Sequence, residues 1–220
     1  MASRRLVLWD FNGTLLDDAH LCLECLNELL RRRGRPGLSF ERYREVFDFP
    51  VVDFYERIGF DFSKESFEVP AQEWVELYHE RVWTQARLHE GALDVLKALA
   101  AAGWTQGVLS AYQRGMLEKL LAHLGIRAFF DPVLGLDDHY AASKVELGRG
   151  WIASSGLAPE SLVLVGDTLH DLETARAMGI RCVLVARGYQ VKSRLLGKDV
   201  PVLDDIRQVA GELLGRLPGY

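Results

Sequence analysis

The sequence predicts an α/β protein in which a parallel sheet carries an inserted, all-helical region. From residue 92 onward, short apolar runs alternate with helical patterns, as in successive βαβ units. One further apolar run, Leu6–Trp9, precedes about seventy residues in which the spacing of apolar positions is helical throughout. We therefore assign residues 1–16 and 90–220 to an α/β core and residues 17–89 to a helical cap over the strand ends.

The first strand leads directly into a polar turn. The apolar run Leu6–Trp9 suits a strand that is buried on both faces, and it is followed by Asp10 and the turn pair Asn12-Gly13. In open parallel sheets the functional groups lie just beyond the carboxyl ends of the strands. We expect Asp10 to face a ligand there, with Gly13 permitting a sharp change of chain direction.

The inserted region is expected to contain four helices. The first begins at Asp17 and Asp18 and stops at Gly34, and the second begins at Ser39 and breaks before Pro50. Their apolar faces, in order, carry Cys22, Cys25, Leu26, Leu29 and Leu30; Phe40, Tyr43, Val46 and Phe47; Val51, Phe54, Tyr55 and Ile58; and Trp74, Leu77, Tyr78 and Val82. Helices alone fill this region in our prediction, with a return hinge at His89–Gly91.

Strands and helices then alternate to the end of the chain. The predicted strands are Trp104–Leu109, Phe129–Leu134, Leu162–Val165, Cys182–Val185 and an edge strand Val200–Leu203. The predicted helices are centred on Leu93–Leu99, Met116–Leu124, Lys144–Ser154, Leu172–Met178 and Ile206–Leu214. Helices of this length between strands imply parallel pairing, because the chain must cross back over the sheet.

Composition and charge exclude several classes of protein. The chain has 220 residues, of which 49% are hydrophobic and 26% charged, as in ordinary globular proteins. A formal net charge of -5 gives no electrostatic reason to expect nucleic acid or an anionic membrane as a partner. No apolar run approaches the roughly 20 residues needed to span a bilayer, and the first apolar run is too short for a secretory signal. We expect a cytoplasmic protein, as a monomer or homodimer.

The three cysteines do not form a metal or redox motif. Cys22 and Cys25 have C-x-x-C spacing, but they lie within a helical apolar pattern, and no second Cys or His pair has zinc-like spacing. Cys182 falls in a strand-like run. All three are expected to be small core residues.

Polar residues gather at the predicted strand ends. The second such site follows Leu162–Val165 and reads Gly166-Asp167-Thr168-Leu169-His170-Asp171. Crowded carboxylates repel one another, so Asp10, Asp167 and Asp171 need a divalent cation, and Mg²⁺ prefers a few carboxylates together with waters and a phosphate oxygen. The full set is Asp10, Asn12 and Thr14; Ser110; Lys144; and Asp167 and Asp171.

This set resembles the four motifs of the haloacid dehalogenase-like hydrolases, in their order. Asp10-Phe-Asn-Gly-Thr14 matches the first motif except at one position, and Val108-Leu-Ser110 is similar to the second. Lys144 corresponds to the third motif and Gly166–Asp171 to the fourth, so the likeness covers nearly the whole chain. The helical insert stands where subclass I members, such as phosphoglycolate phosphatase-like proteins, carry their cap.

The resemblance implies a fold, a cofactor and a reaction. It implies a Rossmann-like, three-layer core and a phosphatase that acts on a small phosphorylated metabolite through an aspartyl-phosphate on Asp10. Mg²⁺ would be held by Asp10, Asp167, Asp171 and the backbone carbonyl of Asn12. Lys144 would balance the charge of the nucleophile and the phosphoryl group, and the phosphoryl oxygens would be held by Thr14, Ser110, Ala111 and Lys144.

Asn12 departs from the family pattern. Phosphatases of this family have an aspartate at this position, which protonates the leaving group and then activates water. The amide of Asn12 can do neither, and general acid–base catalysis contributes roughly 10²–10⁴-fold. The expected catalytic residues Asp10, Asn12 and Lys144 therefore lack the acid–base group that phosphatases of this family have at position 12.

Several interpretations remain open. The enzyme is restricted to acyl or aryl phosphates, whose leaving groups need little protonation; or another group, of which His170 is nearest in sequence, supplies the proton. Alternatively the protein binds a phosphorylated ligand with little or no turnover, or Asn12 deamidates to aspartate in aged samples. A 2-haloacid dehalogenase tolerates a non-acid here but lacks the Asp167/Asp171 pair, and a phosphomutase needs the missing acid. The complete set Asp10, Lys144 and Asp167 favours retained chemistry.

Overall fold

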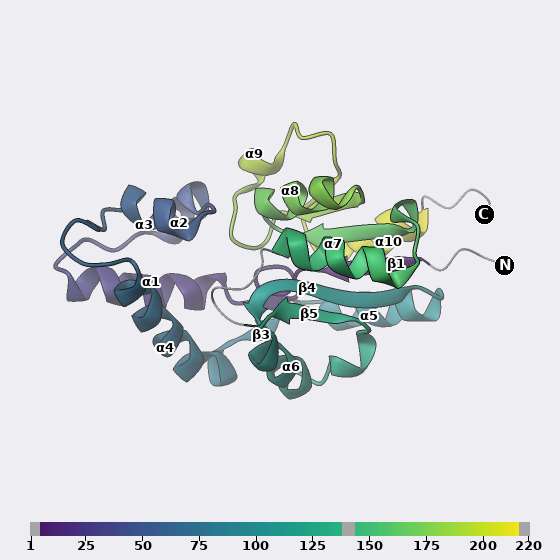
Figure 1. The fold of residues 1–220 in the computed structure, drawn as a ribbon, viewed down its shortest axis with the longest axis horizontal. Coiled ribbons are helices and arrows are strands. Elements are labelled where there is room, and N and C mark those ends of the chain that lie inside the picture. Colours follow the sequence, from purple (N-terminus) through teal and green to yellow (C-terminus); the bar gives the residue numbers. More distant parts are fainter. Residues whose placement is uncertain (1–4, 138–143, 216–220) are drawn as a thin grey trace.

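A six-stranded parallel sheet forms the centre of the core in the computed structural model, which describes residues 5–137 and 144–215 (Figure 1). The strand order is β5-β4-β1-β6-β7-β8, so the first strand lies in the middle, between β4 and β6. The strands are β1 Leu6–Trp9, β4 Thr105–Gln113, β5 Val133–Leu136, β6 Leu162–Gly166, β7 Arg181–Val185 and β8 Val202–Leu203. A Rossmann-like α/β core is thereby confirmed.

Helices cover both faces of this sheet. Because side chains alternate along a strand, Val7 and Trp9 of β1 pack into one hydrophobic cluster, with the helices α5 Ala92–Ala101, α6 Arg114–His123 and α10 Gln208–Gly215. Leu6 and Leu8 pack into a second cluster, with α7 Lys144–Ser155 and α8 Leu169–Met178. Buried on both faces, β1 can be apolar throughout, which explains its sequence.

Four helices between β2 and β3 form a separate body, here named the cap. They are α1 Ala19–Arg32, α2 Phe40–Val46, α3 Val51–Arg57 and α4 Glu68–Gln85. In Figure 1 the cap extends to the left of the sheet, and α1 packs along α4. Ser39 is the N-cap of α2 and accepts a hydrogen bond from the Arg42 N–H, as its position in the sequence suggests. The exact division of the chain into core and cap stays a prediction.

The links between core and cap contain two strands that the sequence did not predict. Leu16–Asp17 (β2) and Arg87–Leu88 (β3) pair antiparallel and form a two-stranded ribbon where the chain enters and leaves the cap. The prediction that the inserted region contains helices alone was therefore wrong. Strands of two residues are too short to show an alternating pattern in the sequence. Just beyond β3, the buried His89 ring lies 3.0 Å from the Gly13 carbonyl oxygen and ties the ribbon to the turn after β1.

Three elements of the core also differ from the prediction. Residues 127–129 form a short 3₁₀ helix, and β5 begins only at Val133. Strand β4 continues past Ser110 to Gln113, with a shift of register against β5 after Leu109. The four-residue helix α9, Lys192–Leu195, is absent from the prediction because one turn carries no helical period.

None of the helices in the described part of the chain is long and apolar enough to cross a lipid bilayer. Cys22, Cys25 and Cys182 are buried free thiols, as their apolar surroundings in the sequence suggest. Burial raises the pKa of the Cys25 thiol to about 11 and that of Cys182 to about 12, so neither is a reactive thiolate at neutral pH.

Candidate active site

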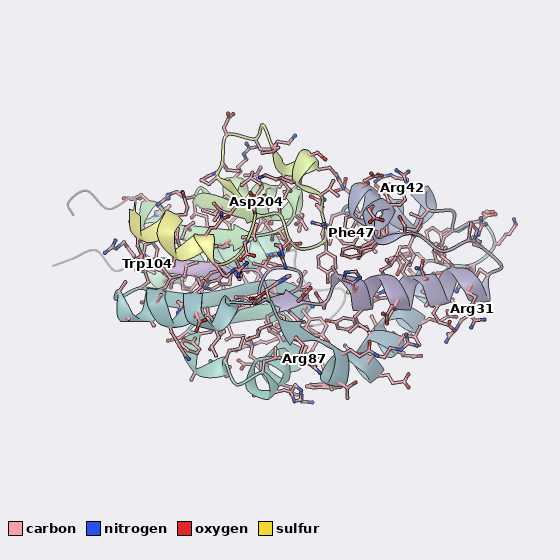
Figure 2. The ribbon with its side chains drawn as sticks, turned by 180° about the vertical axis from the view of Figure 1, so that it is seen from behind. Arg31, Arg42, Phe47, Arg87, Trp104 and Asp204 are labelled. Atoms are coloured by element: carbon pink, nitrogen blue, oxygen red, sulfur yellow. The ribbon has the colours of Figure 1, made fainter. Side chains whose placement is uncertain are left out.

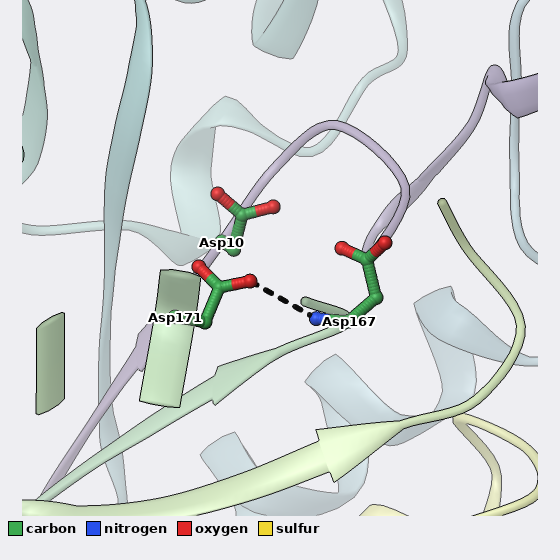
Figure 3. Close-up of side chains that lie close together, drawn as sticks. All are labelled: Asp10, Asp167 and Asp171. Atoms are coloured by element: carbon green, nitrogen blue, oxygen red, sulfur yellow. Dashed lines mark hydrogen bonds between the residues drawn. The ribbon is translucent and has the colours of Figure 1, made fainter. Parts of the chain in front are cut away.

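Three carboxylates from distant parts of the chain meet at the carboxyl ends of the central strands (Figure 3). Asp10 follows β1 directly, and Asp167 and Asp171 follow the neighbouring strand β6, which pairs with β1 in parallel. Each offers an oxygen within 4.8 Å of the others, and all three residues are buried. The topology therefore brings together the three acids that the sequence nominated.

Lys144 lies against two of these carboxylates. Its Nζ is 2.6 Å from Asp10 Oδ1 and 2.6 Å from Asp171 Oδ1, and its side chain is almost fully buried. It is the first residue of α7, but a lysine that merely begins a helix would extend into solvent. Its placement fits the charge-balancing role expected from the sequence.

Carboxylates outnumber cationic groups in the described part of this site. Among residues 5–137 and 144–215, three buried carboxylates meet one ammonium group here. Burial raises the pKa of Asp10 to about 7, against the pull of Lys144, and burial together with Asp10 and Asp171 raises that of Asp167 well above its usual value. Burial acts in the same direction on Asp171, but the adjacent Lys144 ammonium lowers its pKa overall. A divalent cation with a preference for oxygen ligands fits this donor set.

Asp167 is held by the two turns that surround it. Its Oδ1 accepts a hydrogen bond of 2.8 Å from the Thr14 hydroxyl, and its Oδ2 accepts one of 2.6 Å from the Tyr189 backbone N–H. The chain approaches so closely here that a Cβ on Gly13, at φ +78°, would lie 2.6 Å from Asp167 Oδ2, and one on Gly188 would lie 2.1 Å away. Glycine is required at both positions.

Thr14 itself is buried between the carboxylates. Its hydroxyl also lies 3.3 Å from Asp10 Oδ2, and the residue is not part of the cavity lining described below. This geometry suits a residue that orients Asp10 and Asp167. Direct contact between Thr14 and a phosphoryl group stays a prediction.

Asp171 has two simultaneous tasks. Its Oδ2 accepts hydrogen bonds from the Thr168 N–H and hydroxyl, and Thr168 caps the first turn of α8 in return. Its Oδ1 faces Lys144. Asp171 therefore takes part in the capping box of α8, and this fixes the carboxylate beside the site.

The side chain of Asn12 is bound on its nitrogen side by the cap. Nδ2 donates to Asp18 Oδ2 at 2.7 Å and to the Tyr78 hydroxyl at 2.9 Å, and Tyr78 in turn donates to Asp18 Oδ2 at 2.6 Å. A carboxylate can only accept, so it fixes which end of the amide faces it. The amide N–H groups therefore face Asp18 and Tyr78.

A cavity of about 610 Å³ opens from this cluster toward the cap. Asp10, Asn12 and Lys144 lie at one end, together with Ser110 and Ala111 of β4. The Ser110 hydroxyl accepts from the Tyr112 N–H at 3.1 Å, within the stretch where β4 loses its regular register. Ser110 and Ala111 thus line the same cavity as Asp10, although they lie within a strand rather than after its end.

His170 also lines this cavity, beside the carboxylate cluster and under the cap. Its ring lies 4.6 Å from that of Phe49, and burial lowers its pKa. A second ring from the same part of the cap, Phe47, stacks 5.0 Å from Tyr189, where cap and core meet (Figure 2). His170 is therefore half-buried at the edge of the cavity.

Three residues of the site were missed in the sequence. Asp18 was interpreted as the start of a helix, yet its side chain makes no cap hydrogen bond and instead holds Asn12. Tyr78, sixty residues further on, has no sequence signal that links it to Asp18. Tyr189 lies beyond the end of β7, and listing that strand end with the others would have nominated it.

Comparisons with known proteins agree with this architecture. The sequence model of the haloacid dehalogenase-like hydrolases matches residues 7–185. A phosphoglycolate phosphatase from Xanthomonas campestris is 29% identical over 205 residues, which is 90% of this chain and 88% of that protein. A hydrolase of the haloacid dehalogenase-like family from Streptococcus pneumoniae superposes with a TM-score of 0.83 at 20% identity, over 97% of this chain and all of the other.

A third relative is named as a kinase. The tyrosine-protein kinase PtkA of Mycobacterium tuberculosis is 27% identical over 216 residues, covering 95% of this chain and 73% of that protein. Its solved structure superposes with a TM-score of 0.80 at 26% identity, over 97% of this chain and 99% of the other. Because the family match spans most of the sequence and runs from β1 to β7, this chain belongs to the haloacid dehalogenase-like hydrolase family.

Proposed function

We propose that this protein is a magnesium-dependent phosphatase that transfers the phosphoryl group of a small phosphate ester to Asp10 and then to water. The observation that carries the proposal is the buried cluster of Asp10, Asp167 and Asp171 around the Lys144 ammonium, open to a cavity of substrate size. The phosphatase relative supports the reaction class.

Each residue has a defined part in the proposed mechanism. Mg²⁺, held by Asp10, Asp167, Asp171 and the Asn12 backbone carbonyl, would supply charge neutralisation for the phosphate oxygens. Asp10 attacks phosphorus, the bond to the leaving oxygen breaks, and an aspartyl-phosphate forms. Water then attacks that phosphorus and releases Asp10 and phosphate. Lys144 favours the ionised form of Asp10 against the effect of burial and balances the charge that develops.

Asn12 limits which leaving groups this mechanism accepts. Its Nδ2 is engaged by Asp18 and Tyr78, and an amide has no proton to transfer. In the proposed mechanism the leaving oxygen departs with its electron pair and takes a proton from solvent. Turnover should be slow on alkyl phosphates and faster on esters or anhydrides with acidic leaving groups.

Two other reaction classes fit the site less well. The PtkA relative is named as a kinase, which suggests transfer of a phosphoryl group from a nucleoside triphosphate. However, Lys144 is the one Lys or Arg side chain among the described residues that line the cavity. A triphosphate would lack partners for most of its charge. Dehalogenation does not explain the buried acidic cluster, since that reaction proceeds without metal.

The test is a phosphate-release assay with Mg²⁺ on acetyl phosphate, p-nitrophenyl phosphate and a panel of alkyl phosphates. We expect activity on the first two, its loss in Asp10→Asn, and a gain of about 100-fold or more on alkyl phosphates in Asn12→Asp. Release of phosphate by Asp10→Asn at the wild-type rate would refute the nucleophile. Inactivity of both wild type and Asn12→Asp on every substrate would favour the alternative, a phospholigand-binding member of the family.

A further inference from the structure

The cavity beyond the carboxylates is built mainly from rings. Its cap side is formed by residues of α1 to α4 and of the segments that join them. The rings among these residues include Tyr43, Phe47, Phe54, Tyr55, Trp74 and Tyr78. Trp74 and Tyr78 stack with their ring centroids 4.9 Å apart and their planes 14° apart. The Tyr78 hydroxyl reaches Asn12, so the aromatic surface begins at the catalytic turn itself.

The cap arginines are engaged elsewhere. Arginines of the cap could pair with a second anionic group of a substrate, but Arg42, Arg44, Arg57 and Arg81 are not part of the cavity lining. Arg44 donates to backbone carbonyls of the core, Arg57 to the Val46 carbonyl, and Arg42 to Glu45. Among the lining residues that the structure describes, Lys144 is the one Lys or Arg, and Asp10 and Asp171 bind it.

A neutral, flat leaving group satisfies this cavity and the catalytic turn together. A carboxylate or second phosphate would lose hydration without gaining a cation, whereas a ring gains stacking and apolar burial. The alcohol released from an alkyl phosphate has a pKa close to that of water, about 15.7. A phenol has a pKa of about 10, so its phenolate departs without help from an acid. An acyl phosphate has an even better leaving group, because a carboxylic acid ionises at a pH of about 4, but acetyl phosphate has no ring to fill the space.

We propose that the substrates are phosphate monoesters of phenols, whose ring occupies the cavity between α4 and the α2–α3 pair. This inference rests on the proposed function and narrows it. Asp10 forms a bond to phosphorus while the bond from phosphorus to the phenolic oxygen breaks. The phenolate leaves with the electron pair and is protonated by solvent. Water then hydrolyses the aspartyl-phosphate.

The test compares kcat/KM with Mg²⁺ for 1-naphthyl phosphate and acetyl phosphate, whose leaving groups are both acidic but differ in the ring. We expect 1-naphthyl phosphate to be preferred, and the preference to fall about tenfold in Trp74→Ala through a higher KM for the aryl ester. Trp74→Phe, which keeps a ring, should restore most of it. Trp83→Ala removes the same side chain from the same helix outside the cavity and should leave the preference unchanged.

The outcomes separate this inference from the reaction on which it rests. The aryl site would be overturned, and the phosphatase left intact, if kcat/KM for acetyl phosphate equalled or exceeded that for 1-naphthyl phosphate. An equal change of the preference in Trp74→Ala and Trp83→Ala would have the same meaning. No release from either ester would overturn both. A phosphotyrosine peptide assayed beside free phenyl phosphate distinguishes a protein-borne phenol from a small one, and either result as the better substrate supports the site.

Discussion

At the scale of single residues, the site depends on groups whose roles only the folded chain reveals. The sequence nominated Asp10, Lys144, Asp167 and Asp171 because strand ends meet at one edge of a parallel sheet. It could not nominate Asp18 for its present role, since the hydrogen bonds to Asn12 and Tyr78 depend on how the cap sits. Local patterns predict the core contribution to such a site and miss the cap contribution.

Asp18 should make stability depend on pH. Burial raises its pKa in the folded protein, while hydrogen bonds from Tyr78 and Asn12 oppose the rise. The folded state then binds its proton more tightly than the unfolded state, whose Asp pKa is about 3.9. Stability from this group is complete below that pH and is lost as pH rises through the folded pKa.

Asp18→Asn removes this titration. We expect the free energy of unfolding of the variant, relative to wild type, to increase as pH rises above about 4. Urea unfolding of both proteins from pH 4 to 8 in EDTA measures the difference, in which contributions of the other carboxylates largely cancel. A difference that stays constant over this range would show that Asp18 does not titrate abnormally.

Thr14 offers a test of the metal site that does not require turnover. Its hydroxyl donates to Asp167 Oδ1 and lies close to Asp10 Oδ2. Groups that orient metal ligands typically contribute about 10–100-fold to affinity. We expect Thr14→Val to weaken Mg²⁺ binding by about that factor in calorimetry, and Thr14→Ser to retain it. Equal affinity in the two variants would exclude an orienting role, and no binding by wild type would contradict the metal site.

At the scale of elements, most of the core follows from hydrophobic pattern and the details do not. The run Leu162–Gly166 is apolar because it is buried on both faces, so strand β6 was predicted almost to the residue. The start of β5 was placed too early because Phe129 and Phe130 are apolar but precede the strand. Their burial comes from packing on the core, which pattern alone does not distinguish from pairing.

Helix α7 positions Lys144 by lying close to α8. A Cβ on Gly148 would lie 2.5 Å from Met178 Sδ and 3.1 Å from a Leu109 methyl, whereas nothing lies within 4 Å of a Cβ on Gly150. Both glycines are inside the same helix, so replacement by alanine gains the same helix propensity at each.

The pair Gly148→Ala and Gly150→Ala therefore isolates the close packing. We expect Gly150→Ala to raise the free energy of unfolding by about 0.5–1 kcal/mol. Gly148→Ala should be less stable than Gly150→Ala by about 1–3 kcal/mol, because the added methyl displaces buried side chains. Urea unfolding measures both. Equal increases in the free energy of unfolding would mean that α7 and α8 move apart to admit the added methyl group at no cost.

At the scale of the whole molecule, the cap is fastened to the core near the site. Arg44 of α2 donates to the carbonyls of Gly188 at 2.7 Å and of Ala186 and Gln190 at 3.0 Å each. The same loop supplies the Tyr189 N–H to Asp167. A single cap side chain thus holds the loop that holds an active-site carboxylate.

Arg44→Lys should loosen this loop while conserving charge. A lysine ammonium cannot reproduce the planar fork that binds three carbonyls. We expect the amides of residues 186–190 to exchange hydrogen about tenfold faster in mass spectrometry, which corresponds to about 1.4 kcal/mol of lost protection. Arg42→Lys, two residues earlier on α2 and exposed, is the matched control, since the Arg42 guanidinium contacts only Glu45 among the hydrogen-bond partners described. If both variants exchange like wild type, the Arg44 guanidinium does not hold the loop and does not couple the cap to Asp167.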